Sequence, residues 1–271
     1  MEAAPRVIGG ASPIIYMYGF VRLPIGLPQD LRAVEDDTGV LIVPSDEIAC
    51  VASAVDASAY QPAEPRSPQK QLEWVTPRAL RHHELLQRVH AMTAVIPLKF
   101  GTLAPNLDAV RTVLLDRRAA IAAMLERFHA RDEWTLRISV DAAALAAEIE
   151  ASEPRIAAAR TELAGLSDGH AWFARKRLQK AIDDGVAAAR TSLEQRVWAR
   201  LGGDPSVAAL AGEPRTADSD HLVGAALLVE RDRFTRLQSA LAELEDEHRS
   251  SGLSFDLVGP WPPYSFAAAI A

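Results

Sequence analysis

HLVGAALLVERD (residues 221–232) predicts how the C-terminal half of the chain folds. Val, Leu and Ala dominate this stretch, which favours a buried strand, and Asp232 at its end is a residue type that caps helices. The residues after it predict a helix that runs to about residue 250 and is ended by Gly252. GLSFDLVG (252–259) then predicts the last strand, so this part of the chain is expected to form a strand, a helix and a strand.

Upstream, EWTLRISVD (133–141) and PSVAALAG (205–212) predict two further strands that are separated by helical sequence. A new helix is expected at Ser152-Glu153-Pro154, where a capping residue precedes a first-turn proline. Over residues 170–203, apolar residues recur every three or four positions: Leu178, Ile182, Val186, Ala189, Leu193, Val197 and Leu201. This narrow stripe is typical of an antiparallel helical hairpin, predicted over residues 153–203, and both packing within one domain and exposed coiled-coil partnering are compatible with it.

The second half therefore has the order β–αα–β–β–α–β, which is the ferredoxin-like order with its first crossover enlarged into the hairpin. Right-handed crossovers place the first and third strands side by side at the centre of the sheet, and the last strand becomes an edge. Pro260, Pro262 and Pro263 follow or end that strand. An edge tolerates prolines, because its outer backbone donors pair with no neighbouring strand.

The N-terminal half mixes strands and helices. Strands are predicted at residues 14–21, 40–44 and 48–55, and the polar, Pro-rich stretch 56–71 is expected to be an exposed loop. Thr76-Pro77 predicts the start of a helix that ends near Met92, followed by extended chain over 94–102 and an amphipathic helix over 106–130. We therefore expect an α+β protein with a tail (1–13), an N-terminal mixed α/β sheet domain (14–131) and a C-terminal modified ferredoxin-like domain (132–271).

The composition limits the classes of function. Hydrophobic residues make up 49% of the 271 positions, and the formal net charge is −7, which argues against a general nucleic-acid binder. Cys50 is the only cysteine, so an internal disulfide and a cysteine-based zinc site are excluded. The N-terminus is a poor signal peptide and no long apolar run is present, so a cytoplasmic protein that does not bind membranes is expected.

Motifs for catalysis or metal binding are weak. His83 and Glu84 begin an H-E-x-x-H pattern, but position 87 is Gln and the second ligand is absent. His83 and His90 lie about two turns apart on a helix, which is too far for one ion. No nucleophile with a base and no phosphate-binding loop is recognisable, so we expect no enzyme, no metal site and no cofactor.

Several segments, taken in their order along the chain, are more specific. IIYMYGFV, LEWVTPRALRHHELLQRV, VIPLKFGTL, HAWFARKRLQKAI, HLVGAALLVERDR and LVGPWPPYSF follow one another between Ile14 and Phe266. This succession resembles the gas vesicle protein family GvpF/GvpL over nearly the whole chain. The most specific pieces are IPLKFGT, WFARKRL, LLVERDR and GPWPPYSF.

The resemblance implies a fold of two α+β domains, the second a modified ferredoxin-like fold. It also implies an accessory protein of gas vesicles, the hollow protein shells that provide buoyancy. Such a protein would act in the cytoplasm and at the vesicle as a minor shell-associated component that assists nucleation or assembly. Its expected partners are the hydrophobic shell subunit and other accessory proteins, whereas self-association is left open. The alternative is a stable structural minor component of the shell without a chaperone role.

A free strand edge with apolar side chains could occupy the shell subunit before assembly. We therefore predict a partner-binding surface at the last strand and the aromatic segment after it, comprising Phe255, Leu257, Trp261, Tyr264 and Phe266. A different interpretation of these aromatic residues is that they close the interface between the two domains. The two interpretations differ in whether substitution of Trp261 and Tyr264 affects stability or only partner binding.

Overall fold

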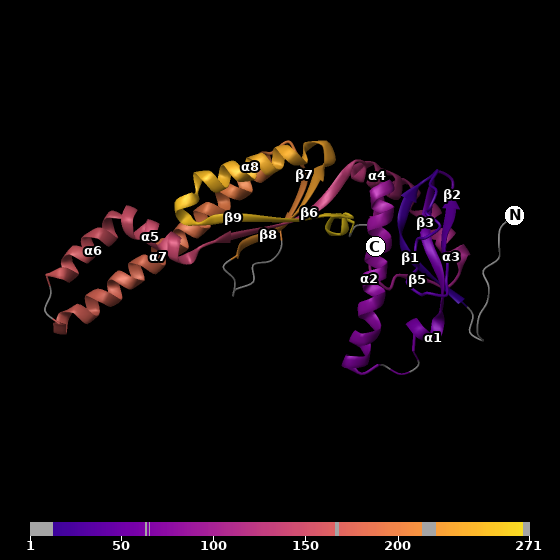
Figure 1. The fold of residues 1–271 in the computed structure, drawn as a ribbon, viewed down its shortest axis with the longest axis horizontal. Coiled ribbons are helices and arrows are strands. Elements are labelled where there is room, and N and C mark those ends of the chain that lie inside the picture. The colour runs from indigo at the N-terminus through magenta and orange to yellow at the C-terminus, as the bar shows by residue number, and fades with distance from the viewer. Residues whose placement is uncertain (1–12, 63, 65, 166–167, 213–220, 268–271) are drawn as a thin grey trace. The chain divides into compact units, whose positions relative to one another are not determined.

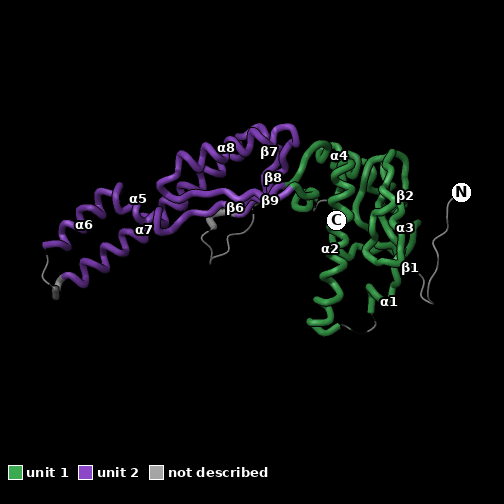
Figure 2. Tube along the Cα trace, viewed as in Figure 1, with its two compact units in different colours: residues 1–133, 260–271 green, residues 134–259 purple. Residues whose placement is uncertain are grey.

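The computed structural model describes residues 13–62, 64, 66–165, 168–212 and 221–267. The chain divides into two compact units: unit 1 comprises residues 1–133 and 260–271, and unit 2 comprises residues 134–259 (Figure 2). The prediction assigned all residues from 132 to 271 to the C-terminal domain. For the segment after Gly259 this is wrong, because that segment packs against side chains of unit 1. The predicted tail lies outside the described residues except for Pro13, which begins the first strand.

Unit 1 is built on an antiparallel sheet (Figure 1). Its strand order is β2-β3-β1-β4, and β5 also pairs with β1. The strands are β1 (Pro13–Arg22), β2 (Val40–Ser45), β3 (Ile48–Asp56), β4 (Val95–Pro97) and β5 (Leu103–Ala104). The central strand β1 is buried from Ile15 to Val21, because it has neighbours on both edges and helices α2 and α4 pack against it.

The helices of unit 1 are α1 (Ala57–Tyr60), α2 (Pro68–Met92), α3 (Leu107–Asp116) and α4 (Arg118–Phe128). The helix start predicted at Thr76 is wrong, because α2 begins two turns earlier and contains Pro77. The loop predicted over residues 56–71 is therefore wrong in part, since it includes α1 and the first residues of α2. Ser67 and Pro68 form a second cap-and-proline pair, and Thr76 donates from its hydroxyl to the Leu72 carbonyl at 2.8 Å. The predicted helix 106–130 is divided at Arg117, where the backbone leaves the helical region (φ −108°, ψ 12°).

Unit 2 contains the second sheet, with the order β7-β8-β6-β9. As predicted, its first and third strands, β6 (Arg131–Val140) and β8 (His221–Glu230), are adjacent at the centre, and the last strand β9 (Leu253–Trp261) is an edge. The other edge is β7 (Val207–Gly212), which pairs antiparallel with β8. Helix α8 (Phe234–Glu247) connects β8 to β9 through a tight turn at Gly252, whose φ of +64° favours glycine.

Between β6 and β7 lie helices α5 (Ala142–Ser152), α6 (Pro154–Ala164) and α7 (Asp168–Gly203), and α5 and α6 both contact α7. The predicted apolar stripe of α7, from Leu178 to Leu201, is buried or half-buried. Gly185 lies on the same side of α7, where a Cβ atom would be 2.8 Å from Ile149 of α5. One side of α7 is therefore covered by the protein's own side chains. None of the helices in the described part of the chain has the length and apolar character needed to cross a membrane.

Candidate functional site

The predicted partner-binding residues lie on β9 and the short turn that follows it. Phe255 and Leu257 point to the inner face of β9 and pack, half-buried, against the core of unit 2. Side chains on the other face of the strand are exposed, among them Asp256 and Val258. The first two predicted residues therefore support the edge strand from inside and are not its outer surface.

Trp261 and Tyr264 contact His83 of α2, within unit 1. The His83 ring lies 5.3 Å from the Trp261 ring and stacks on the Tyr264 ring at 5.9 Å, measured between centroids. His83 Nδ1 and the Tyr264 hydroxyl are also within hydrogen-bond distance, at 3.2 Å. Burial lowers the pKa of His83 and raises the pKa of Tyr264, so both groups are held in their neutral forms near pH 7.

The end of the segment is held by the buried carboxylate of Glu133. This carboxylate accepts hydrogen bonds from the Ser265 backbone N–H and hydroxyl, both at 2.8 Å. The Arg127 guanidinium lies 6.0 Å from the centre of the Phe266 ring. The structure thus divides the predicted set: Phe255 and Leu257 belong to unit 2, and Trp261, Tyr264 and Phe266 anchor the C-terminal segment to unit 1.

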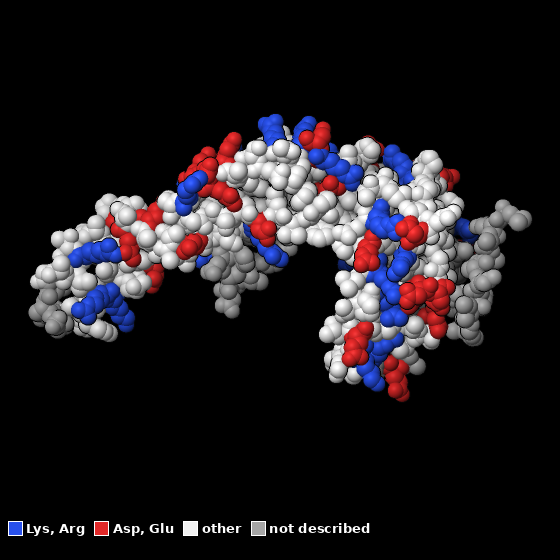
Figure 3. All heavy atoms as spheres, viewed as in Figure 1, with Lys and Arg blue, Asp and Glu red and all other residues white. Residues whose placement is uncertain are grey.

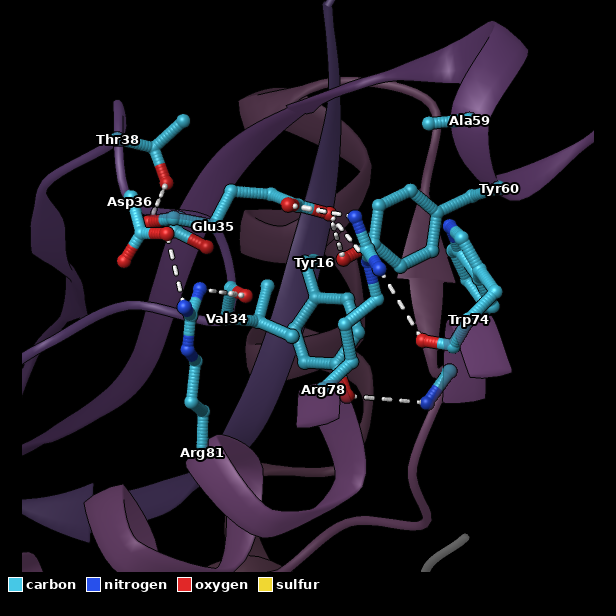
Figure 4. A network of polar contacts seen from close by, with 12 residues as sticks. Tyr16, Val34, Glu35, Asp36, Thr38, Ala59, Tyr60, Trp74, Arg78 and Arg81 are labelled. Atoms are coloured by element: carbon cyan, nitrogen blue, oxygen red, sulfur yellow. Dashed lines mark hydrogen bonds and ion pairs between the residues drawn. The ribbon is translucent and has the colours of Figure 1, made fainter. Parts of the chain in front are cut away.

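Sequence reasoning missed a polar and aromatic network on the N-terminal half of α2, which Figure 4 shows. Arg78 binds both carboxylate oxygens of Glu35, at 2.8 and 3.0 Å, and the Tyr60 hydroxyl donates to the same carboxylate at 2.9 Å. The guanidinium groups of Arg66 and Arg78 lie 4.4 and 4.6 Å from the centre of the Trp74 ring. The network connects α1, α2 and the loop after β1.

A separate chain of hydrogen bonds lies in the core, next to this network, where the Tyr16 ring contacts the Tyr60 ring at 5.6 Å between centroids. The Gly101 N–H donates to the Tyr16 hydroxyl at 3.1 Å, and that hydroxyl lies 2.9 Å from His82 Nδ1. His82 Nε2 is 3.2 Å from the Leu98 carbonyl oxygen. A neutral imidazole with its proton on Nε2 satisfies every contact, because Nδ1 then accepts from Tyr16 and Nε2 donates to Leu98. Burial lowers the pKa of His82 to about 4, which is consistent with this neutral form.

The histidines that the sequence singled out are placed apart. His83 contacts the C-terminal aromatic residues, whereas His90 lies 2.7 Å from Asp132 through its Nε2 atom. Among the described residues, no group of three or more His, Cys, Asp or Glu side chains could hold a metal ion. Basic and acidic side chains alternate over α2 in Figure 3, which is the pattern of a paired surface and not of one large charged patch.

Comparison with known proteins gives a consistent result. A family model described as gas vesicle synthesis protein GvpL/GvpF matches residues 14–268. The chain is 28% identical over 255 residues to gas vesicle protein L of Streptomyces sp. (strain CB03234), which covers 93% of this chain and 92% of that protein. It is 28% identical over 189 residues to gas vesicle protein F of the same strain, covering 69% and 76%.

Two solved structures share the fold. The crystal structure of GvpF from Anabaena sp. PCC7120 superposes with a TM-score of 0.69 at 20% identity, covering 94% of this chain and 98% of that one. GvpF from Microcystis aeruginosa superposes with a TM-score of 0.62 at 15% identity and the same coverage. At these identities the likeness concerns the fold alone.

Proposed function

The chain belongs to the family of gas vesicle synthesis proteins GvpL/GvpF, and we propose from this that it is an accessory protein of gas vesicle assembly. It acts as a minor shell-associated component that binds the hydrophobic shell subunit and assists nucleation or assembly. It works by docking and not by transforming a substrate, and it needs no cofactor. The match over residues 14–268 carries this proposal, because it spans both units of the structure.

The free edge of unit 2 supports a docking role. Strand β9 pairs on one side with β6, and no strand of the described residues pairs with its other side. Here the Phe255 N–H donates to the Glu245 carboxylate at 2.6 Å, so this donor is already occupied. Residues two apart on a strand direct their backbone N–H groups to the same side, so the Leu257 N–H points to the same side of β9 as the Phe255 N–H. A shell subunit with an unpaired strand could add to this edge.

Side chains on the inner face of β9 hold this edge in place. Phe255 and Leu257 pack β9 on the core of unit 2, whereas Trp261 and Tyr264 contact His83 within unit 1. This packing favours a supporting role for the predicted residues and leaves the outer edge of β9 as the contact surface. The strand order of unit 2 also supports our interpretation of this unit as a modified ferredoxin-like fold, with α5–α7 inserted in its first crossover.

Val258→Lys is expected to weaken binding to purified shell subunit by about tenfold or more, because a charge on an edge strand opposes the addition of another strand. Val258 is 36% exposed, so the fold should be unchanged. The measurement is the dissociation constant in a pull-down titration, with circular dichroism as the check on folding. Ala208→Lys is the matched control, because Ala208 is exposed on the opposite edge strand β7.

The outcomes distinguish a failure of the proposed function from a failure of the proposed docking edge. A parent chain that does not bind shell subunit at all contradicts the proposed function. Normal binding by Val258→Lys together with lost binding by Ala208→Lys contradicts only the choice of β9 as the docking edge.

Retention in purified vesicles distinguishes the assembly role from a stable structural role. An assembly factor is expected to be lost when isolated vesicles are washed under mild conditions, because a transient contact must be released after each addition. The measurement is the ratio of this protein to shell subunit before and after washing. A constant ratio through repeated washes would favour the structural component.

A further inference from the structure

The side of α7 opposite its buried stripe is exposed and carries aromatic, charged and small side chains. Nine exposed residues form this α7 outer face: Trp172, Phe173, Lys176, Arg177, Lys180, Asp183, Asp184, Ala187 and Ala188. Counted at about 100° per residue, they fall within about 160° of arc. The buried Ala174 and Ile182 and the covered Gly185 lie on the opposite side of the helix.

The aromatic end of this face is unusually open. Trp172 is 56% exposed and Phe173 is 66% exposed, although the two rings contact each other edge to face at 4.7 Å. Lys176 Nζ lies 5.3 Å from the centre of the Trp172 ring. Adjacent exposed aromatic residues beside cations are typical of protein contact surfaces. Packing inside unit 2 therefore does not account for these two side chains.

The order of residue types along the α7 outer face is self-complementary. Aromatic residues come first, then the basic Lys176 and Arg177, then the acidic Asp183 and Asp184, and then two alanines. Lys180 lies at the midpoint of this series. In an antiparallel copy related by a two-fold axis near Lys180, the basic pair of one helix faces the acidic pair of the other. The aromatic residues of each helix then lie over the small alanines of its partner.

We propose that a second copy of this chain docks antiparallel along the α7 outer face, forming a two-fold dimer. In this arrangement the basic pair of each helix contacts the acidic pair of the other, so the same contact forms twice. A two-fold dimer requires a surface that is complementary to itself in this way. Basic and acidic side chains both lie where α6 and α7 are seen in Figure 3. In a parallel pair of identical helices the basic residues would face basic residues and the acidic residues would face acidic ones, so that orientation is disfavoured. The dimer does not depend on binding to the shell subunit.

Contacts within the chain do not prevent this pairing. Arg177 lies 3.6 Å from Glu162, and Lys180 lies 2.6 Å from Asp184. Both side chains of each pair are exposed, and an exposed ion pair contributes only about 0–1 kcal/mol to the free energy of unfolding. They can therefore be exchanged for contacts with a partner helix. Lys180 faces its own copy in the dimer, where the acidic pairs of the two helices lie on either side of it.

The contact is short, so the dimer is weak. Residues 172–188 span about 25 Å of helix, which buries less area than a standard protein interface. Dissociation is therefore expected in the micromolar range, with weaker association as salt is added, because exposed charges are screened.

Sedimentation velocity between about 5 and 200 µM tests the proposal, since weak interfaces dissociate in this range. The parent chain is expected to dimerise with rising concentration. The charge-reversal variants K176E/R177E and D183K/D184K are each expected to dimerise at least about tenfold more weakly, and an equimolar mixture of the two is expected to form a heterodimer. Arg175→Glu is the matched control, because Arg175 is exposed on α7 outside the outer face and should not affect dimerisation.

Three results would overturn the dimer. These are a parent chain that stays monomeric over the whole range, charge reversals that leave dimerisation unchanged, and two variants that do not associate when mixed. A monomeric chain whose W172A/F173A variant loses binding to the shell subunit would assign the face to a different partner.

Discussion

The Arg78→Met protein is expected to have a free energy of unfolding about 2–3 kcal/mol below that of the parent chain. Arg78 makes two hydrogen bonds to Glu35 and a third to the Trp74 carbonyl at 3.1 Å. The side chains of Arg78 and Glu35 are only 22% and 19% exposed. Removal of the cation leaves a largely buried carboxylate with one remaining donor, the Tyr60 hydroxyl. The Glu35 carboxylate thereby loses its paired charge and the hydrogen bonds from Arg78, and this loss is the reason for the expected decrease in the free energy of unfolding.

The measurement is urea denaturation, together with amide hydrogen exchange in α1 and the first half of α2. Arg88→Met is the matched control, because Arg88 makes an equally short 2.8 Å ion pair with Asp30, with exposures of 41% and 77%. This exposed pair is expected to contribute less than about 1 kcal/mol. Equal effects of the two substitutions would show that the Arg78 network does not stabilise the protein.

A double-mutant cycle isolates the pair itself. Glu35→Gln combined with Arg78→Met is expected to give a coupling energy above about 1 kcal/mol, since both groups share one partly buried contact. In these variants, amide hydrogen exchange is expected to be fastest around Trp74. This part of α2 has exposed neighbours such as Leu72 (67% exposed), so few contacts other than the Arg78 network hold it in place.

The N-terminal half of α2 shows why local rules misplace a helix start. Thr76-Pro77 has the features of a cap and first turn, and the Pro-rich sequence before it favours a loop. Trp74, Arg78 and His82 nevertheless recur every four residues, which is the spacing of one helix face. Their partners Tyr60, Glu35 and Tyr16 are far away in sequence. These long-range contacts hold the two additional turns, and a single sequence does not reveal them.

Unit 2 was easier to predict, because its pattern is regular. The alternation of strands and helices and the rule of right-handed crossovers predicted the strand order, with β6 beside β8 and β9 at the edge. The stripe along α7 likewise predicted which side of that helix is buried. Both predictions rest on repeated local signals, and not on any single contact.

The position of the C-terminal segment could not be predicted in the same way. Its aromatic character indicated a contact surface, but the contacts depend on His83, which lies 181 positions earlier in the chain than Tyr264. Glu133 is a second distant partner. Whether the five predicted residues also touch another protein remains a prediction, and the Val258 experiment addresses the strand that they support.

Acidification is expected to lower the free energy of unfolding by about 3 kcal/mol between about pH 6.5 and about pH 4 through His82 alone. His82 is 3% exposed, and burial lowers its pKa to about 4, against an ordinary value of 6.5. In this window the unfolded chain binds a proton at His82 and the folded chain does not. The contribution is therefore fully present above the ordinary pKa, is lost as the pH falls through the window, and changes no further below it.

The structural reason is the chain of donors and acceptors around the ring. A protonated imidazole has two N–H donors, so Nδ1 can no longer accept from the Tyr16 hydroxyl. That hydroxyl already accepts from the Gly101 N–H, and it would have to direct its own proton elsewhere in a buried site. The stacked Tyr18 ring, whose centroid is 5.6 Å away, offers no compensating charge.

His82→Gln removes the titrating group while keeping an acceptor and a donor at this position. Its free energy of unfolding, measured by urea denaturation at intervals from pH 8 to pH 4, is expected to vary less with pH than that of the parent chain by about 3 kcal/mol over the window. His129→Gln is the control for the substitution itself, because His129 is exposed and outside this hydrogen-bonded chain. Parallel profiles for the parent chain and His82→Gln would mean that His82 accepts its proton in the folded protein as readily as in the unfolded one.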